Sequence, residues 1–397
     1  MRLSPLIAVS SLALPVGLQA QEIRRAVPSQ GVRYAQPLPV LAGNDVANFL
    51  AGVPLPEASP LAPLQRTSWY REHVAALARL SQRFDRNYYS KMRAWSAAEL
   101  APRIPMRVPV YYFFSGPDAV SPLALFPDAP VYILGGLESV GSIMPPNALA
   151  PEEVAFGLEN LRKSAEVILS FGHFITKDMK AELDRTAFRG VLPLIYMFIA
   201  LTGGEIVSTR YIAVVGGGAV QELGSESVQS KGQLPGVRVD FRGRGRSEVQ
   251  SLIYVQANVA DDFLKSNGSL LQWASSHGGG NVYLKAASYL LHEPYFSRIR
   301  SFLLNYAISV LQDDSGIPFR FFRDGRWQLW LFGTYSGPLE IFAKYYQSDL
   351  QSAFATSGAA APLPFGTGYK WRMGESNLML AIKQQAQTPG SAPPIQR

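Results

Sequence analysis

Apolar and polar positions follow two different periods along the chain, and these periods predict helices and strands in turn. Trp69, Leu77, Leu80 and Phe84 recur near helical spacing after Ser68, which can cap a helix start. Residues 107–114 and 131–134 are instead nearly continuous apolar runs, and each stops at a turn that contains glycine. Because buried parallel strands read as unbroken apolar runs, two such runs with a short crossover predict a parallel sheet.

The same alternation continues to the end of the chain. Residues 151–201 have helical spacing, and residues 205–259 return to the strand pattern. Residues 319–322 and 327–332 flank Asp324-Gly325, a pair that suits the type I′ turn of a β-hairpin. The pattern therefore predicts an α/β fold: a mostly parallel or mixed sheet with flanking helices and a β-hairpin near 319–332.

The two ends of the chain differ from its middle. Residues 1–20 place Arg2 before an apolar run and end in the small residue Ala20, which is typical of a secretory signal peptide. The alternative is an uncleaved membrane anchor, but Pro15 and Gly17 interrupt the run. We expect a proline-rich extended arm over 21–65, one large domain over 66–383 and a disordered tail over 384–397. The apolar run 191–201 is too short for a bilayer, so we expect no transmembrane span in the mature chain.

The amino-acid composition excludes several kinds of site and partner. Of the 397 residues, 47% are hydrophobic and 17% charged, which is enough apolar surface for a large core. The chain has no cysteine, which excludes disulfides, thiolate metal sites, iron–sulfur clusters and a cysteine nucleophile. A net charge of +7 is mild for this length. Together with the export signal, the lack of a concentrated basic face argues against a nucleic-acid partner.

Polar residues follow several of the predicted strands and predict a ligand site. Ser115 and Asp118 follow the first strand, Glu138 the second, and Asp313 and Asp314 a later one. His292 is a further candidate at a predicted helix start. Open α/β sheets bind ligands at the carboxyl ends of their strands, so these residues are expected to converge there. The alternative is that they only cap turns and helix starts, as Ser and Asp do in most proteins.

Three kinds of chemistry are weighed against this simple ligand site. A serine hydrolase would use Ser115 with His173, His277 or His292, but Phe113 and Pro117 stand where the nucleophile elbow needs glycine. A dinucleotide site would use Gly116 and Glu138, which lie 22 positions apart, although the three-glycine pattern is missing.

A metal site would combine the imidazole of His292 with oxygen ligands from Asp118, Glu138, Asp313 and Asp314. The sequence contains no spaced metal-binding motif. Whether the protein binds a metal or another cofactor stays open.

Two further surface features have competing interpretations. At one strand ending, three arginines share a face: Arg242, Arg244 and Arg246. They could bind an anionic polymer, but the preferred interpretation is a solvated edge strand, whose charges prevent pairing with other strands. Trp327 and Trp330 could stack on sugars, although strand aromatics are usually packing partners.

The segment YYFFSGPD at 111–118, followed by FPDA at 126–129 and YILGGLE at 132–138, resembles a pattern found in uncharacterised exported bacterial proteins. The resemblance covers about thirty residues and implies export; it brings no activity with it. The leading hypothesis is an exported cell-envelope protein, periplasmic or secreted, whose partner is an unknown small molecule or envelope polymer. The alternatives are a periplasmic or secreted hydrolase that uses acidic residues, and an envelope scaffold or interaction protein.

Overall fold

The computed structural model describes residues 42–171, 183, 185–225, 232–356, 358 and 360–384, all within one compact unit. The predicted signal peptide, most of the arm and most of the tail lie outside the described residues, as does His173.

The described residues form helices and strands in alternation. The helices are α1 (Gly43–Leu50), α2 (Ser68–Phe84), α3 (Ser90–Trp95), α4 (Val120–Leu125), α5 (Pro151–Phe171), α7 (Leu192–Leu201), α8 (Asp261–Ser266), α9 (Ser269–Ser275), α10 (Ser297–Tyr306) and α11 (Ser348–Ala355). The strands are β1 (Val110–Tyr112), β2 (Val131–Gly136), β3 (Ser142–Ile143), β4 (Phe188–Arg189), β5 (Glu205–Val214), β6 (Val220–Leu223), β7 (Leu234–Arg242), β8 (Val249–Gln256), β9 (Gly280–Leu284), β10 (Ala307–Gln312), β11 (Trp327–Gly333), β12 (Ala360–Ala361) and β13 (Asn377–Lys383).

One large sheet organises the fold. Its 11 strands have the order β12-β11-β13-β10-β9-β1-β2-β8-β7-β5-β6. The strands from β10 to β8 in this order are parallel, and the pairs β10–β13, β11–β13, β7–β8, β5–β7 and β5–β6 are antiparallel. The predicted α/β fold with a mixed sheet and flanking helices is confirmed, as is the parallel pairing of β1 with β2.

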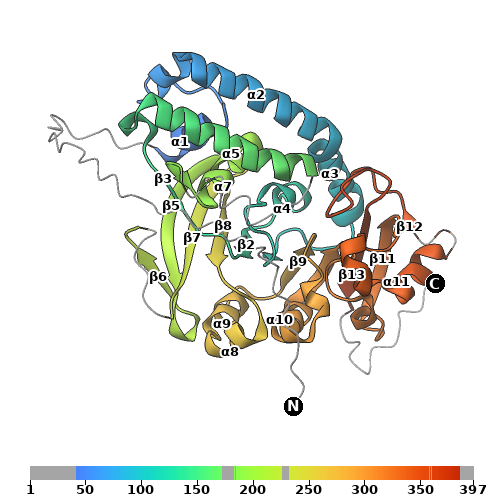
Figure 1. Cartoon of the computed structure of the whole chain (residues 1–397). Helices are drawn as coiled ribbons and strands as arrows, with labels where there is room; N and C mark the ends of the chain where they lie inside the picture. The colour runs from blue at the N-terminus through green and yellow to red at the C-terminus, as the bar shows by residue number, and fades with distance from the viewer. Residues whose placement is uncertain are drawn as a thin grey trace, which may run out of the picture. The chain divides into compact units, whose positions relative to one another are not determined.

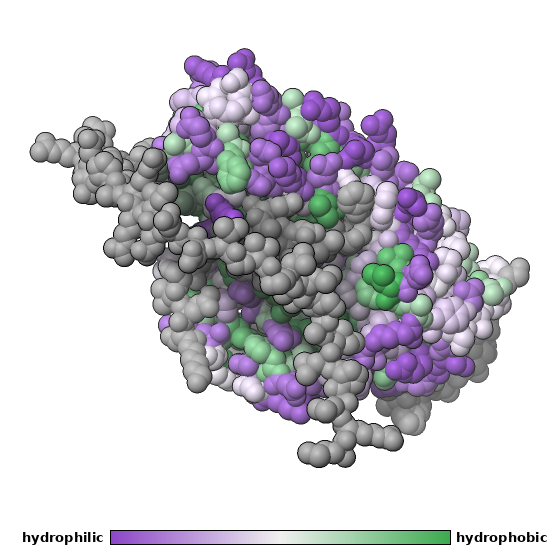
Figure 2. Space-filling view, in the orientation of Figure 1, coloured by the Kyte–Doolittle hydropathy of each residue, from purple (hydrophilic) through white to green (hydrophobic). Residues whose placement is uncertain are grey.

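Helices cover both faces of this sheet (Figure 1). Successive side chains of a strand point to opposite faces, so each parallel strand contributes to two cores. In β1, for example, Tyr112 belongs to the core under α2, α5 and α7, whereas Tyr111 belongs to the core with α9 and α10. On the visible outer face, hydrophilic residues predominate over α2 and α5 (Figure 2). The continuous apolar strands read in the sequence follow from this burial on both faces.

The prediction of an extended arm over 21–65 is wrong for residues 43–50, which are helical. Residues 43–50 form α1, whose Val46, Phe49 and Leu50 are buried in the core. No proline lies between Pro39 and Pro54, so this part of the predicted arm is free to form a helix. An eight-residue helix is marginal in isolation, so α1 depends on packing against the rest of the fold.

Two local predictions about strands are also wrong. Residues 319–322 form a 3₁₀ helix, and β11 pairs with β13 and β12, so the predicted β-hairpin is absent. The strand that carries Arg242 is not at an edge, because β7 lies between β5 and β8. Arg246, just beyond this strand, forms an ion pair with Asp128.

Candidate functional site

The order of the parallel strands creates a position where a ligand site is expected. In chain order these strands are β1, β2, β8, β9 and β10. The sheet extends from β1 through β2 to β8 on one side, and through β9 to β10 on the other. Doubly wound sheets bind ligands outside the carboxyl ends of their strands, at the reversal point, where the chain begins to add strands on the opposite side of the first strand. In this protein that point lies between β1 and β9.

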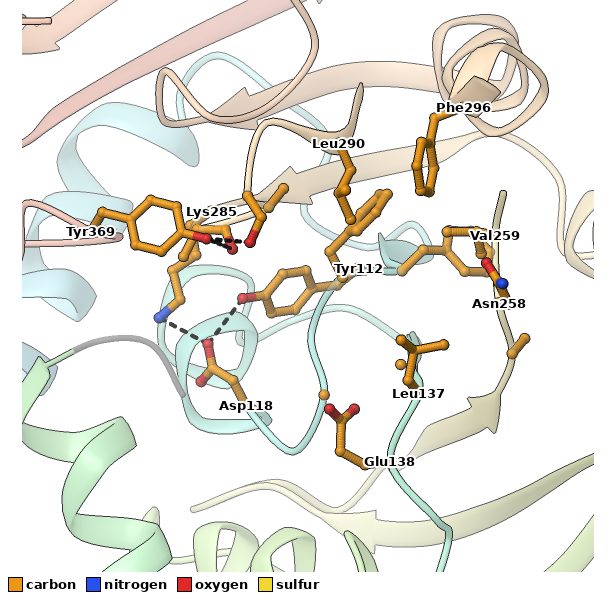
Figure 3. A pocket seen from close by; sticks show the side chains of 18 residues that line it. Tyr112, Asp118, Leu137, Glu138, Asn258, Val259, Lys285, Leu290, Phe296 and Tyr369 are labelled. Carbon is orange, nitrogen blue, oxygen red and sulfur yellow. Dashed lines mark hydrogen bonds and ion pairs between the residues drawn. The ribbon is translucent and has the colours of Figure 1, made fainter. Parts of the chain in front are cut away.

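A cavity of about 190 Å³ lies at these strand ends. Its walls come from the residues that follow β1, β2, β8 and β9, and from one residue between β12 and β13. They include Phe114, Asp118, Leu137, Glu138, Asn258, Val259, Lys285, Leu290, Phe296 and Tyr369. In Figure 3 the apolar side chains surround one end of the space, Asp118, Lys285 and Tyr369 surround the other, and the Glu138 carboxylate points in between them. The cavity is therefore amphipathic along its length.

A buried ion pair closes the polar end. The Lys285 ammonium lies 2.8 Å from Asp118 Oδ2, and the two side chains are only 5% and 2% exposed. Tyr112 donates to the same oxygen over 3.1 Å, and Lys285 also donates to Ser121 Oγ over 2.8 Å. Burial, together with the Asp118 charge, raises the pKa of Tyr112 well above its usual value, so this phenol stays a neutral donor. The pair places a carboxylate and a cation side by side with no net charge.

Glu138 is held against the carboxyl end of β2. Its side chain is buried, and its carboxylate and backbone carbonyl accept from the Tyr254 hydroxyl over 3.4 and 2.8 Å. Gly136 makes this arrangement possible, because a Cβ at this position would lie 2.3 Å from Glu138 Oε2 and 3.0 Å from the Gly116 Cα. The glycine is required by close approach and not by its backbone angles.

The loop after β9 has a strained backbone where it lines the cavity. Ala286, Ser288 and Tyr289 have φ values of 47°, 50° and 56°, and these are the non-glycine residues with positive φ in the described part of the chain. Left-handed backbone costs about 1–3 kcal/mol at each such residue and persists only where surrounding contacts impose it, most often at functional sites. Three strained residues lie within this one loop, so the surrounding contacts must impose its conformation.

Asp313 and Asp314 provide those contacts from behind the loop and do not line the cavity. Asp313 Oδ2 accepts from the Ala286 backbone N–H over 2.9 Å, and the Ala287 N–H donates to Ser315 Oγ over 2.9 Å. Asp314 accepts from the Tyr289 hydroxyl. Burial, and then the neighbouring charge of Asp314, raise the pKa of Asp313 to about 7. These two acids hold the strained loop in place and are positioning residues.

The remaining predicted site residues lie elsewhere. Ser115 is fully buried, and its hydroxyl donates to the Gly135 carbonyl and accepts from the Gly135 N–H, each over 3.2 Å. It ties β1 to β2 and cannot reach a substrate as a nucleophile. His292 lines a separate cleft with Arg320 and Lys344; burial, and then Arg320, lower its pKa to about 4.

The five residues considered for a metal site are therefore split between the cavity, the layer behind it and a second cleft. Among the residues that the structure describes, no group of three or more His, Asp or Glu side chains is arranged to hold a metal ion.

Sequence reasoning missed several residues of the cavity, among them Lys285 and Tyr369. Lys285 directly follows the end of β9 at Leu284, inside an apolar stretch of the sequence. The signal was a lone lysine in an apolar run. Tyr369 reaches the cavity from a loop before β13, where its hydroxyl donates to the Ala286 carbonyl over 3.0 Å. No local pattern could have found that contact.

Comparison with protein families, with curated proteins and with solved structures found no match for this chain. In the described residues, no helix has the length and apolar character needed to cross a membrane.

Proposed function

We propose that this protein binds a small organic molecule in the cavity between the carboxyl ends of β1, β2, β8 and β9. The observation that carries the proposal is the strained loop at 286–289, which two buried acids hold against a cavity at the reversal point of the sheet. A ligand site needs a concave, mostly apolar wall with a few oriented polar groups. Phe114, Leu290 and Phe296 supply the first, and Asp118 and Glu138 the second.

The test is to block the cavity at its mouth. Leu137 is 54% exposed and lines the cavity, so Leu137→Trp should fill the entrance without disturbing the core. Met144 is 46% exposed and does not line the cavity, which makes Met144→Trp the matched control. We expect fragments that bind the wild-type protein in ligand-observed NMR to lose binding to Leu137→Trp and to retain binding to Met144→Trp. A fragment set that finds no ligand, or ligands that ignore Leu137→Trp, would refute the proposal.

The hydrolase alternative would need one carboxylate in the cavity as acid or base. Asp118 is engaged by Lys285, and Asp313 and Asp314 lie behind the loop, which leaves Glu138 for this role. A screen of chromogenic ester, amide and glycoside substrates tests this alternative. Hydrolysis that is lost in Glu138→Gln would favour it over simple binding.

We also propose that the protein is exported, as a periplasmic or secreted protein of the cell envelope. The support is the basic residue, apolar run and small residue at 1–20, together with the resemblance at 111–138. Mass spectrometry of the native protein should find a chain that begins after Ala20. An intact Met1 on protein purified from its native source would contradict removal of this segment.

A further inference from the structure

We infer that the ligand of this cavity is a nucleoside, a ring and ribose without a diphosphate. The inference rests on the proposed function and names its ligand class. It depends on three features of the site: an acid at the end of the second parallel strand, a long apolar end, and a first turn whose backbone donors are already used.

The acid is Glu138. In doubly wound sheets that bind nucleotides, a carboxylate about 20 residues beyond the glycine turn accepts from the ribose hydroxyls. Gly116 and Glu138 are 22 positions apart in the sequence, and the structure brings the Gly116 Cα and the Glu138 carboxylate to the same side of Gly136. The spacing alone was weak evidence. The strand order adds the missing context, because β1 and β2 are adjacent parallel strands beside the reversal point.

The apolar end suits a flat heterocycle. Leu137 and Val259 lie on two sides of it, and Leu290 and Phe296 close it from above in Figure 3. Asn258 lies at the rim, where its Oδ1 accepts from the Ala260 N–H over 2.9 Å. That bond occupies the amide oxygen and leaves the Nδ2 donors for the ring nitrogens or carbonyl oxygens that every nucleobase carries. Apolar faces with one polar edge are what a base requires.

The first turn argues against a phosphorylated ligand. Phosphate sites in these folds use free backbone N–H groups at the turn after the first strand. Here the N–H groups of Ser115 and Gly116 both donate to the Gly135 carbonyl, over 3.0 and 3.2 Å, and the Asp118 N–H donates to the Ser115 carbonyl over 3.0 Å. Pro117 has no N–H, and the Asp118 carboxylate lies in the same turn. At this turn a diphosphate would meet the Asp118 carboxylate, whose charge already balances that of Lys285, and no unused backbone N–H of residues 115–118.

The experiment titrates the full-length protein by calorimetry with adenosine, guanosine, cytidine and uridine, and then with analogues of the best binder. We expect at least one ribonucleoside to bind. Its 2′-deoxy or 3′-deoxy analogue should bind about tenfold more weakly, since a hydrogen bond to a charged group is lost. The corresponding nucleoside diphosphate should bind more weakly than the nucleoside.

Variants assign the effect to residues. Glu138→Gln should weaken the ribonucleoside about tenfold and abolish the preference over its deoxy analogue. Asn258→Ala should weaken all nucleosides of the same base equally. Glu248→Gln, which changes an acid that is 60% exposed and paired with Arg107, is the matched control and should bind as the wild type does. Melting temperatures verify that each variant is folded.

Each outcome decides one of the two proposals. If no ribonucleoside binds but fragments bind and are excluded by Leu137→Trp, the nucleoside inference fails and the small-molecule cavity stands. Binding that is insensitive to Glu138→Gln, or a diphosphate that binds more tightly than its nucleoside, also overturns the inference. If neither nucleosides nor fragments bind, both proposals fail.

Discussion

Breaking the ion pair between Asp118 and Lys285 should destabilise the protein far more than a surface pair would. The two charged atoms are 2.8 Å apart, and the side chains are 2% and 5% exposed. At an effective dielectric constant of about 20, their attraction is about 6 kcal/mol, of which desolvation cancels a large part. Removing one partner of such a pair leaves a buried, unpaired charge and costs about 3–5 kcal/mol.

The assay is a double-mutant cycle in urea at pH 7. Asp118→Asn keeps an acceptor for Tyr112 and strands the Lys285 ammonium; Lys285→Met keeps the length of the side chain and strands the Asp118 carboxylate. We expect each single variant to lose about 3–5 kcal/mol of unfolding free energy. The double variant contains no buried charge at this pair, so its loss should be smaller than the sum by at least about 2 kcal/mol.

A surface pair provides the comparison. Arg107 and Glu248 are 3.1 Å apart but 71% and 60% exposed, so Arg107→Met and Glu248→Gln should each cost less than about 1 kcal/mol and couple weakly. Raising the salt concentration should weaken this surface pair and leave the buried pair nearly unchanged. Additive effects of Asp118→Asn and Lys285→Met, within about 0.5 kcal/mol, would refute the reasoning that the two charges stabilise each other.

Three further predictions concern the surrounding elements. Burial raises the pKa of Asp313 to about 7, so this group holds a proton in the folded state that the unfolded chain has released above about pH 4; its contribution is present at low pH and lost as pH rises to about 7. Urea melts from pH 4 to 8 should show this fall in stability, and Asp313→Asn should reduce it; an unchanged slope would contradict the assignment. Gly136→Ala should lower the melting temperature and displace Glu138, because the new Cβ would lie 2.3 Å from its Oε2; a variant with wild-type stability and ligand binding would show that the site relaxes freely. Gly325 has φ 78° with open space around it, so Gly325→Val should cost about 1 kcal/mol or more from backbone strain alone, measured as a loss of unfolding free energy in urea; no loss would mean that the turn adapts.

Part of the cavity lining was predictable from the sequence. Asp118 and Glu138 were found because each follows a strand that is apolar on both faces, and parallel strands align their carboxyl ends. Asp313 and Asp314 satisfied the same rule after β10, yet the folded chain places them behind the cavity. The loop after β9 lies between β10 and the cavity and separates these two acids from it. The rule that ligand sites lie at strand ends does not predict that a neighbouring loop will intervene.

The sequence by itself determined the features that depend on neighbouring residues. These are the parallel strands β1 and β2, the long helix α5 and the buried helix α7. In each of these segments, the spacing of the apolar residues indicates both the secondary structure and the buried face. Tertiary structure alone decided which segments meet. Asp324-Gly325 had the chemistry of a hairpin turn, but β11 found its partner in β13, which follows about 45 residues later and offers seven paired positions. The pairing of Asp118 with Lys285 and the strained backbone at 286–289 arise in the same way, because only the folded sheet brings β1 and β9 together and supplies the contacts that impose the strain.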